Sequence, residues 1–455
     1  MSRLRDEVAA RLPDECIQLD PDVLGTYGQD RALFEQPGQA DVLVMPRSTE
    51  EVVQAVQAAA AAGAAVVPRG AGTGLTGAAN AVDGCLQLSL HRMDQILDID
   101  VTNRMARVQP GVINADLKRA VAEHGLFYPP DPASYEMSSI GGNVATNAGG
   151  LCCVKYGVTR DYVVGLEVVL ASGDVLHTGR STLKNSAGLD LTGLFVGSEG
   201  LLGITTEITV KLVAAPPPPA TAVAFFDSLP SVGSTIAETF RQGHDPSLME
   251  IIDRASLEQV EAVYRMGLDT GAACLLLIQT DLTDAEEQID AIATICRSEG
   301  ASEVHVAPDP EEGEALIEAR RRVHPALERL GKQLLPEDVA VPRERMVDLL
   351  QGIEDIATQS GVDVFTVGHA GDGNMHPLLV FDADDEEEVT RAKRAFEDIL
   401  SLSLSLGGTI AAEHGVGTLK RQYLVDELDP VQLHLQRQLK ATLDPENRMN
   451  PGKKL

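Results

Sequence analysis

Residues 68–79 read PRGAGTGLTGAA, and within them residues 72–77 spell G-x-G-x-x-G, the fingerprint of a dinucleotide-binding Rossmann turn. A Rossmann turn needs a helix that starts within the glycines, because the pyrophosphate lies on the amides at that helix's N-terminus. Here residues 78–82 lead directly to a turn at Asp83 and Gly84 and then to the strand pattern CLQLSL at 85–90. The predicted order of helix, strand, glycine loop and strand therefore disfavours a Rossmann unit and gives no support for NAD.

Two interpretations of this glycine loop remain. Glycines tolerate positive φ and let an anion approach the backbone, so successive N–H groups can form a nest for a phosphate. The loop can also be a plain connection, preceded by a helix that a capping box at 48–51 (STEE) starts and Gly63 ends. Similar loops at 128–150 (YPPDPASYEMSSIGGNVATNAGG) and 197–204 (GSEGLLGI) favour the nest. Together with the closing Asn450-Pro451-Gly452-Lys453, they indicate one long polar ligand, such as a dinucleotide.

The composition restricts the class of protein. The chain has 68 Asp and Glu residues against 37 Lys and Arg, a formal net charge of −31. Such a surface repels polyphosphate backbones, so we expect no nucleic-acid partner. We find no signal sequence, no membrane-spanning run, and no zinc-ribbon or disulfide spacing among the six cysteines. The expectation is a cytoplasmic protein with reduced thiols; attachment to the membrane periphery through a partner is left open.

The run AAPPPPA at 214–220 is the clearest boundary, because four prolines stiffen the chain between domains. Beyond it, helix patterns at 230–242 and 283–298 alternate with strand patterns at 221–227, 247–253, 273–281 and 302–307. This alternation predicts an α+β sandwich of ferredoxin-like type. Strands at 363–370 and 376–381, an acidic helix at 384–406 and a strand at 408–412 (GTIAA) are expected to follow.

A second constellation of polar residues lies in this half. If GHAGDGNMH (368–376) folds as a hairpin, His369 and His376 come together at one end of the sheet. Glu413 and His414 follow the expected strand GTIAA. Two histidines and a carboxylate with an open position make a candidate catalytic site for a divalent metal, zinc by ligand type and manganese as the alternative. The other interpretation is that these histidines only line a polar turn.

The order PRGAGTGLTG, SIGGNVATNAGG, KYGVTRDYVVGLEVVLASG and FVGSEGLLGI resembles the FAD-binding domain of the vanillyl-alcohol oxidase/p-cresol methylhydroxylase superfamily. Within it, the chain is similar to the branch of D-lactate dehydrogenases, the FAD subunit of glycolate oxidase and D-2-hydroxyglutarate dehydrogenase. The resemblance implies an α+β fold. An N-terminal segment (1–36) would precede a PCMH-type FAD-binding domain of two α+β subdomains (37–215). A substrate and metal domain (216–455) would follow, with a ferredoxin-like cap and a C-terminal helical segment that returns to the flavin.

The resemblance also implies which residues bind FAD. The pyrophosphate would lie against Arg69, Gly70, Ala71, Gly72, Thr73, Gly74 and Leu75. The flavin, ribityl and adenine portions would contact Pro130, Ser139, Gly142, Asn143, Thr146, Ala148, Gly149, Gly203, Ile204 and Asn450. Residues 1–90 contain no histidine that could attach the flavin, so we predict non-covalent FAD. Whether Cys152 or Cys153 contacts the flavin is left open.

In that branch, residues matching His369, His376 and Glu413 bind a metal, and the residue matching His414 acts on the substrate. The resemblance implies that Arg320 grips the substrate carboxylate, a contact that a guanidinium can make with two hydrogen bonds. The implied reaction is oxidation of a D-2-hydroxy acid to the 2-keto acid. His414 would take the hydroxyl proton and a hydride would pass to the flavin N5.

Two departures bear on the substrate. D-2-hydroxyglutarate enzymes carry a lysine where this chain reads Leu335-Pro336-Glu337-Asp338, and an asparagine soon after the second histidine, where it has Pro377. These positions offer no partner for a second substrate carboxylate, which favours glycolate or D-lactate. Electrons would leave to an external acceptor: an iron–sulfur partner subunit, a quinone or an electron-transfer protein. A homodimer is left open.

Four alternatives are carried forward. A D-2-hydroxyglutarate-type dehydrogenase would use the same cofactor, metal ligands and base. An ether-lipid synthase of the same superfamily would not need the metal motif. A metal-dependent hydrolase would use the glycine loops only as structure. A non-catalytic flavin subunit would not keep the C-terminal His and Glu residues.

Overall fold

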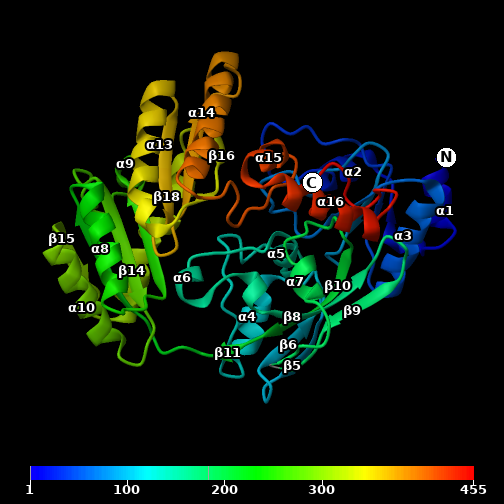
Figure 1. The fold of residues 1–455 in the computed structure, drawn as a ribbon, viewed down its shortest axis with the longest axis horizontal. Coiled ribbons are helices and arrows are strands. Elements are labelled where there is room, and N and C mark those ends of the chain that lie inside the picture. Colours follow the sequence, from blue (N-terminus) through cyan, green and yellow to red (C-terminus); the bar gives the residue numbers. More distant parts are fainter. Residues whose placement is uncertain (1, 183) are drawn as a thin grey trace. The chain divides into compact units, whose positions relative to one another are not determined.

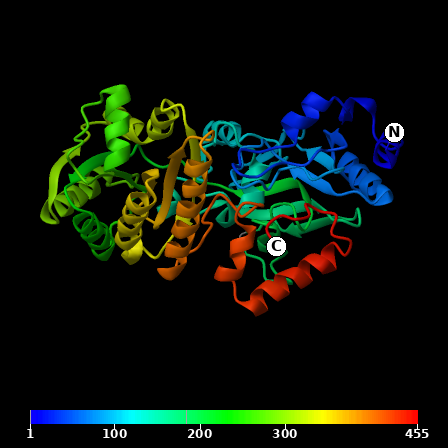
Figure 2. The same ribbon diagram turned by 90° about the horizontal axis from the view of Figure 1, so that it is seen from above.

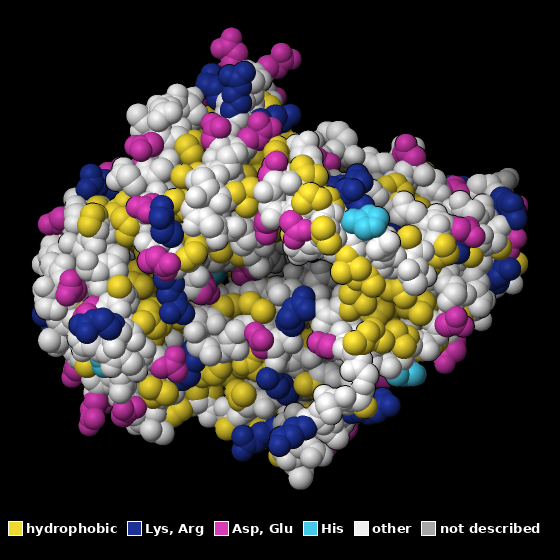
Figure 3. Space-filling model, in the orientation of Figure 1, with side chains coloured by type: hydrophobic (Ala, Val, Ile, Leu, Met, Phe, Trp, Pro, Cys, Tyr) yellow, Lys and Arg dark blue, Asp and Glu magenta, His cyan; other side chains and the backbone are white. Residues whose placement is uncertain are grey.

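A computed structural model of the protein describes residues 2–182 and 184–455. The chain divides into two compact units, each with its own sheets and helices (Figure 1). Unit 1 comprises Met1–Gly149, Gly157–Ala215 and Glu413–Leu455, and unit 2 comprises Gly150–Tyr156 and Pro216–Ala412. Strands and helices are mixed in both, so the predicted α+β class is confirmed. The acidic side chains are scattered over the face seen in Figure 3.

Unit 1 begins with a four-stranded sheet in the order β1-β2-β4-β3, formed by β1 (Ile17–Gln18), β2 (Val42–Val44), β4 (Leu86–Ser89) and β3 (Val66–Arg69). The last three strands are parallel. Helices α1 (Arg3–Ala9) and α3 (Thr49–Ala62) bury apolar side chains in the same core as these strands, while α2 (Pro21–Tyr27) follows β1. The order helix, strand, glycine loop, strand is confirmed, since no helix lies between Arg69 and Leu86.

The capping of α3 follows the sequence with one difference. The Ser48 side chain accepts a hydrogen bond from the Glu51 amide, and Gly63 ends the helix at φ +70°. The Glu51 carboxylate, however, accepts from the amide of Arg47, not from that of Ser48. The helix start is therefore capped by two side chains, but not as the reciprocal box that the pattern predicted.

A five-stranded antiparallel sheet forms the second part of unit 1, in the order β5-β6-β10-β8-β9. Its strands are β5 (Ile96–Asp100), β6 (Met105–Val108), β10 (Ile204–Lys211), β8 (Val163–Val169) and β9 (Val175–Gly179). β7 (Leu126–Phe127) pairs with β11 (Val213–Ala214). The accompanying helices are α4 (Asn114–Ala122), α5 (Ile140–Thr146), α7 (Leu191–Phe195), α15 (Leu424–Glu427) and α16 (Pro430–Leu443). Figure 2 shows α16, in red, on the outside of the unit.

Unit 2 is built on one large sheet, whose path runs β15-β12-β14-β13-β18-β19-β16, with β17 paired to β19. The strands are β12 (Ala220–Phe226), β13 (Leu248–Asp253), β14 (Cys274–Thr280), β15 (Ala301–Val306), β16 (Gln333–Pro336), β17 (Val339–Ala340), β18 (Asp363–His369) and β19 (Asn374–Phe381). The first four have the antiparallel order of a ferredoxin-like fold, with strands contributed in the order fourth, first, third and second. The predicted pairing of β18 with β19 is confirmed, and β18 also pairs with β13, so that the hairpin extends this sheet.

Helices cover the sheet of unit 2. They are α6 (Cys153–Tyr156), α8 (Leu229–Arg241), α9 (Arg254–Tyr264), α10 (Ala285–Ser298), α11 (Pro310–Arg321), α12 (Val323–Glu328), α13 (Met346–Ser360) and α14 (Glu386–Ser405). Side chains of α9, α11 and α12 share one hydrophobic core with alternate residues of β12, β13, β14, β18 and β19. Among the described residues, no helix is both long and apolar enough to span a membrane.

One strand prediction was wrong. GTIAA (408–412) does not form a strand; Thr409 makes an isolated bridge with Ala340. Thr409 and Ala340 exchange both backbone hydrogen bonds, and the pairing does not extend beyond this one bridge. The Ser403 hydroxyl, near the end of α14, lies within hydrogen-bonding distance of the carbonyls of the same two residues.

A partly buried carboxyl in unit 2, that of Asp253, makes stability depend on pH. The Asp253 side chain accepts hydrogen bonds from the amides of Ser256 and Thr366, and its burial raises its pKa to about 6. Because the folded pKa exceeds the unfolded value of about 3.9, the folded state binds the proton more tightly, and stability falls as pH rises from about 4 to 6. We expect Asp253→Asn to remove this dependence. Relative to the variant, the wild type should gain about 1 kcal/mol of unfolding free energy when urea denaturation is moved from pH 7 to pH 5.

Candidate functional site

The two histidines predicted to meet do so in unit 2. β18 and β19 pair antiparallel with Val367 opposite His376, so the side chains of His369 and His376 fall on the same face of the sheet. Their Nε2 atoms are 3.2 Å apart and the ring planes cross at 81°. The turn between them needs Gly373, which has φ +84° and where a Cβ would lie 2.2 Å from the carbonyl oxygen of Val341.

A buried glutamate orients the first histidine. Glu250 lies opposite His369 on the neighbouring strand β13, and its Oε1 is 2.5 Å from His369 Nδ1. Its Oε2 accepts a hydrogen bond of 2.8 Å from Nε of Arg320 on α11. The Glu250 side chain is fully buried. A carboxylate that accepts the Nδ1 proton leaves the lone pair on Nε2, the nitrogen that faces His376. Metal-binding histidines are commonly held in this way.

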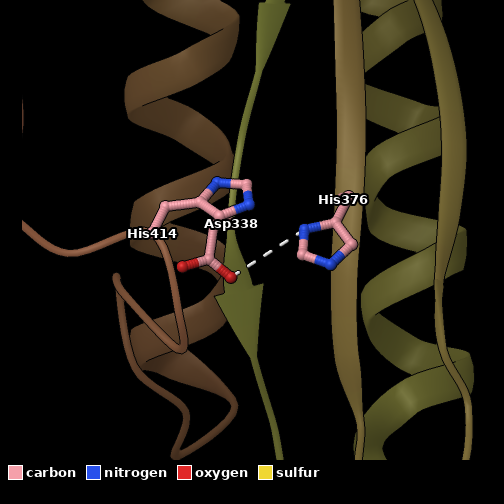
Figure 4. Close-up of side chains that lie close together, drawn as sticks. All are labelled: Asp338, His376 and His414. Atoms are coloured by element: carbon pink, nitrogen blue, oxygen red, sulfur yellow. Dashed lines mark ion pairs between the residues drawn. The ribbon is translucent and has the colours of Figure 1, made fainter. Parts of the chain in front are cut away.

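A second carboxylate faces His376. Asp338 lies between β16 and β17, both of which pair with β19, and its Oδ1 is 3.9 Å from Nδ1 of His376 (Figure 4). Its Oδ2 accepts a hydrogen bond from the amide of Ala412. Glu413 and His414 are the next residues along the chain, so their Cα atoms lie within about 4 and 8 Å of that of Ala412. Within unit 2, the imidazoles of His369 and His376 and the carboxylate of Asp338 form a donor set suited to a divalent metal such as zinc.

In unit 1, the glycine loop (residues 70–77) meets the start of α5. A Cβ on Gly70 would lie 2.6 Å from Oγ of Ser139, whose side chain caps α5 by accepting from the amide of Gly142. Gly72 and Gly77 have φ +76° and +81°. Residues 69–75 are at least partly exposed, so their backbone can be approached. Two of the segments expected to bind FAD thus come together around positions where side chains are excluded, and they fit a phosphate cradle.

Charged groups flank this loop. The Arg69 guanidinium is 5.5 Å from the centre of the Tyr27 ring and donates to the carbonyl of Gln29. Burial lowers the pKa of Arg69 and raises the pKa of Asp30, whose carboxylate also accepts from the amide of Ala32. The cation beside Gly72 is the partner that a pyrophosphate needs in an otherwise acidic chain.

The other residues expected at the cofactor lie in different settings. Gly142 and Thr146 are partly exposed on α5, whereas Asn143 is buried and its Oδ1 accepts from Asn114. The remaining buried positions are Pro130, Ala148, Gly149, Gly203 and Ile204. The Asn450 side-chain amide donates to the carbonyls of Ala78 and Glu199. A contact of each with the cofactor stays a prediction.

Three acidic residues that contact predicted site residues were not among the residues predicted from the sequence. Glu250 lies in the apolar strand SLMEIID, between Leu248 and Ile252, whose side chains face the core. A charged residue at a position that alternation assigns to the core was the signal that could have identified it. Asp338 and Glu199 lie inside quoted motifs but carry no local pattern that sets them apart. Cys152 and Cys153, whose contact with the flavin was left open, belong to unit 2.

The comparisons with known proteins agree with this architecture. Residues 40–179 match the family described as FAD binding domain, and residues 215–454 match FAD linked oxidases, C-terminal domain. The chain is 43% identical to the glycolate oxidase subunit GlcD of Bacillus subtilis, over 91% of this chain and 88% of that one. It is 35% identical to a D-lactate dehydrogenase of Archaeoglobus fulgidus, over 90% of each chain.

A solved structure of p-cresol methylhydroxylase with substrate bound has the same fold, with a TM-score of 0.80 over 99% of this chain and 96% of that one, at 18% identity. This agreement confirms the PCMH-type fold. The family matches confirm the resemblance inferred from the glycine loops. The chain belongs to the FAD-linked oxidases and is an FAD-dependent oxidoreductase.

Proposed function

We propose that this enzyme oxidises a small D-2-hydroxy acid, glycolate or D-lactate, to the corresponding 2-keto acid. The names of its relatives, glycolate oxidase subunit and D-lactate dehydrogenase, support this substrate class. The observation that carries the proposal is the chain of contacts that runs from the partly exposed Arg320 through the buried residues Glu250, His369 and His376. It joins a cation for the substrate carboxylate to a pair of imidazoles, within a family that oxidises its substrates with FAD.

When bound, FAD would accept the hydride, and a divalent metal, zinc by ligand type or manganese, would act as a Lewis acid towards the substrate. We propose His369, His376 and Glu413 as the metal ligands, because Glu413 directly follows Ala412, which is bonded to Asp338. His414 takes the proton of the substrate hydroxyl as general base. Arg320 holds the substrate carboxylate with its terminal nitrogens while its Nε stays on Glu250.

The electrons leave to an acceptor outside this chain. The glycolate oxidase relative is a subunit by name, which supports a partner protein, with a quinone as the alternative. The D-2-hydroxyglutarate alternative remains, since it differs only in the second carboxylate. A hydrolase with purely structural glycine loops receives no support from the FAD-linked relatives.

The test is an anaerobic screen of 2-hydroxy acids with the purified flavoprotein. We expect a yellow protein whose flavin absorbance is bleached by glycolate or D-lactate, and far more slowly by L-lactate and D-2-hydroxyglutarate. Faster bleaching by D-2-hydroxyglutarate than by either small acid would replace the proposed substrate with the alternative. A flavin that none of these acids reduces would contradict the proposed function.

A further inference from the structure

Glu199 carries a buried charge in unit 1 that none of the assigned roles uses. It lies in the motif GSEGLLGI between Gly197 and Gly200, its side chain is fully buried, and its backbone is in the left-handed region at φ +51°. A buried carboxylate and a positive φ at a residue with a Cβ are both costly, and such strain persists where the surrounding contacts over-determine it. The contacts of the Glu199 carboxylate therefore show which segment of the chain this residue holds in place.

Both carboxylate oxygens bind the segment that carries His414, here called the His414 loop (residues 413–419). Oε1 accepts from the amide of Val416 and Oε2 from the amide of Gly417, each at 2.8 Å. Lys454 adds an ion pair to Oε1 at 3.1 Å. Two backbone amides bound by a single carboxylate fix the path of the chain two and three residues after His414.

The same loop is bound from its other side by the glycine loop. The carbonyl of Thr76 accepts the amides of Thr418 and Leu419, and the Thr76 hydroxyl is 3.5 Å from the carbonyl of His414. A Cβ on Gly415 would lie 2.9 Å from Oε1 of Glu199, and one on Gly417 would lie 2.0 Å from the carbonyl of Thr76. The His414 loop is therefore held closely between Glu199 and Thr76 of the glycine loop.

We propose that Glu199 is a positioning residue that holds His414 in place against the loop that cradles the cofactor. This inference rests on the proposed role of His414 as the base. In this proposal, the distance between His414 and the cofactor is fixed by contacts within unit 1 alone. A misplacement of about 1 Å at a reacting group can cost about 100-fold in rate, which is the scale of effect expected when this anchor is lost.

Glu199→Gln tests the anchor with an isosteric side chain. An amide presents one oxygen and one NH₂, so one of the two backbone donors, Val416 N–H or Gly417 N–H, must face another donor. We expect kcat to fall by about 10- to 100-fold, with KM for the hydroxy acid unchanged because Arg320 is intact. The FAD content should remain that of the wild type. Hydrogen exchange in peptides covering 413–419 of the holoenzyme should accelerate by at least about tenfold.

Glu167→Gln is the matched control, since this glutamate also lies in unit 1 and accepts from Thr49 and Thr206. It should change neither kcat nor exchange at 413–419. Glu199→Asp keeps the charge in a residue type that tolerates positive φ, and should retain part of the activity even if the glutamine variant fails to fold. Unchanged exchange at 413–419 in Glu199→Gln would overturn the inference. A fall in FAD content and kcat together with a rise in KM would also overturn it. The exchange measurement needs no substrate, so it stands even if the proposed substrate class is wrong.

Discussion

Replacing His414 with alanine is expected to leave FAD bound and to slow anaerobic flavin reduction by the hydroxy acid by about 10²- to 10⁴-fold, the range supplied by a positioned general base. The glycine loop and the start of α5, which meet at Gly70 and Ser139, do not need the imidazole, so the cofactor content should match the wild type. Stopped-flow absorbance of the flavin measures the loss directly.

His434→Ala provides a matched control for this variant. His434 lies in unit 1 on α16 with an exposed side chain, and its loss should leave flavin reduction at the wild-type rate. Reduction of the His414→Ala flavin at the wild-type rate would remove His414 from the mechanism. Loss of FAD from the same variant would instead assign His414 to cofactor binding.

Removal of the second histidine should abolish metal binding. In His376→Ala, protein stripped with a chelator should take up no zinc or manganese and regain no activity, whereas the stripped wild type should recover both. Glu250→Gln should weaken metal affinity by about 10- to 100-fold, because the carboxylate that holds the Nδ1 proton of His369 is lost. Metal content by elemental analysis and titration of the stripped protein give these affinities without reference to turnover.

Asp281→Asn serves as the control for the metal variants. Asp281 is another buried carboxylate of unit 2, paired with Lys155 and Tyr156, and it makes no contact with either histidine in the described chain. Its loss should reduce stability without changing metal affinity. A wild-type protein that binds no divalent metal after stripping and reloading would contradict the metal role, while leaving the flavin chemistry in place.

The sequence predicted those features that repeat or that depend on local geometry. Alternating strand and helix patterns predicted the ferredoxin-like part of unit 2, and the missing helix after Gly77 argued against a Rossmann turn. The hairpin at Gly371 and Gly373 brought His369 and His376 together, because strand register follows from the turn.

What could not be predicted depends on contacts between distant segments. Glu250 meets Arg320 across 70 residues and Glu199 meets Val416 across 217, and neither pair has a spacing that a local pattern could reveal. The strand expected at 408–412 was wrong for a related reason. Its apolar, β-branched residues satisfy strand propensity, but its only strand-like pairing among the residues that the structure describes is the single bridge between Thr409 and the distant Ala340.

The short segment Gly150–Tyr156 has a consequence for how this protein can be divided. It is flanked by unit 1 in the sequence, yet it belongs to unit 2, where Lys155 and Tyr156 bind Asp281. A fragment that begins at Pro216 would lack this segment, here called the strap, and would leave the buried Asp281 without Lys155 and Tyr156. Unit 2 is therefore not a module that a single cut or gene fusion can transplant. Recombination between relatives must carry the strap along with the sheet it binds.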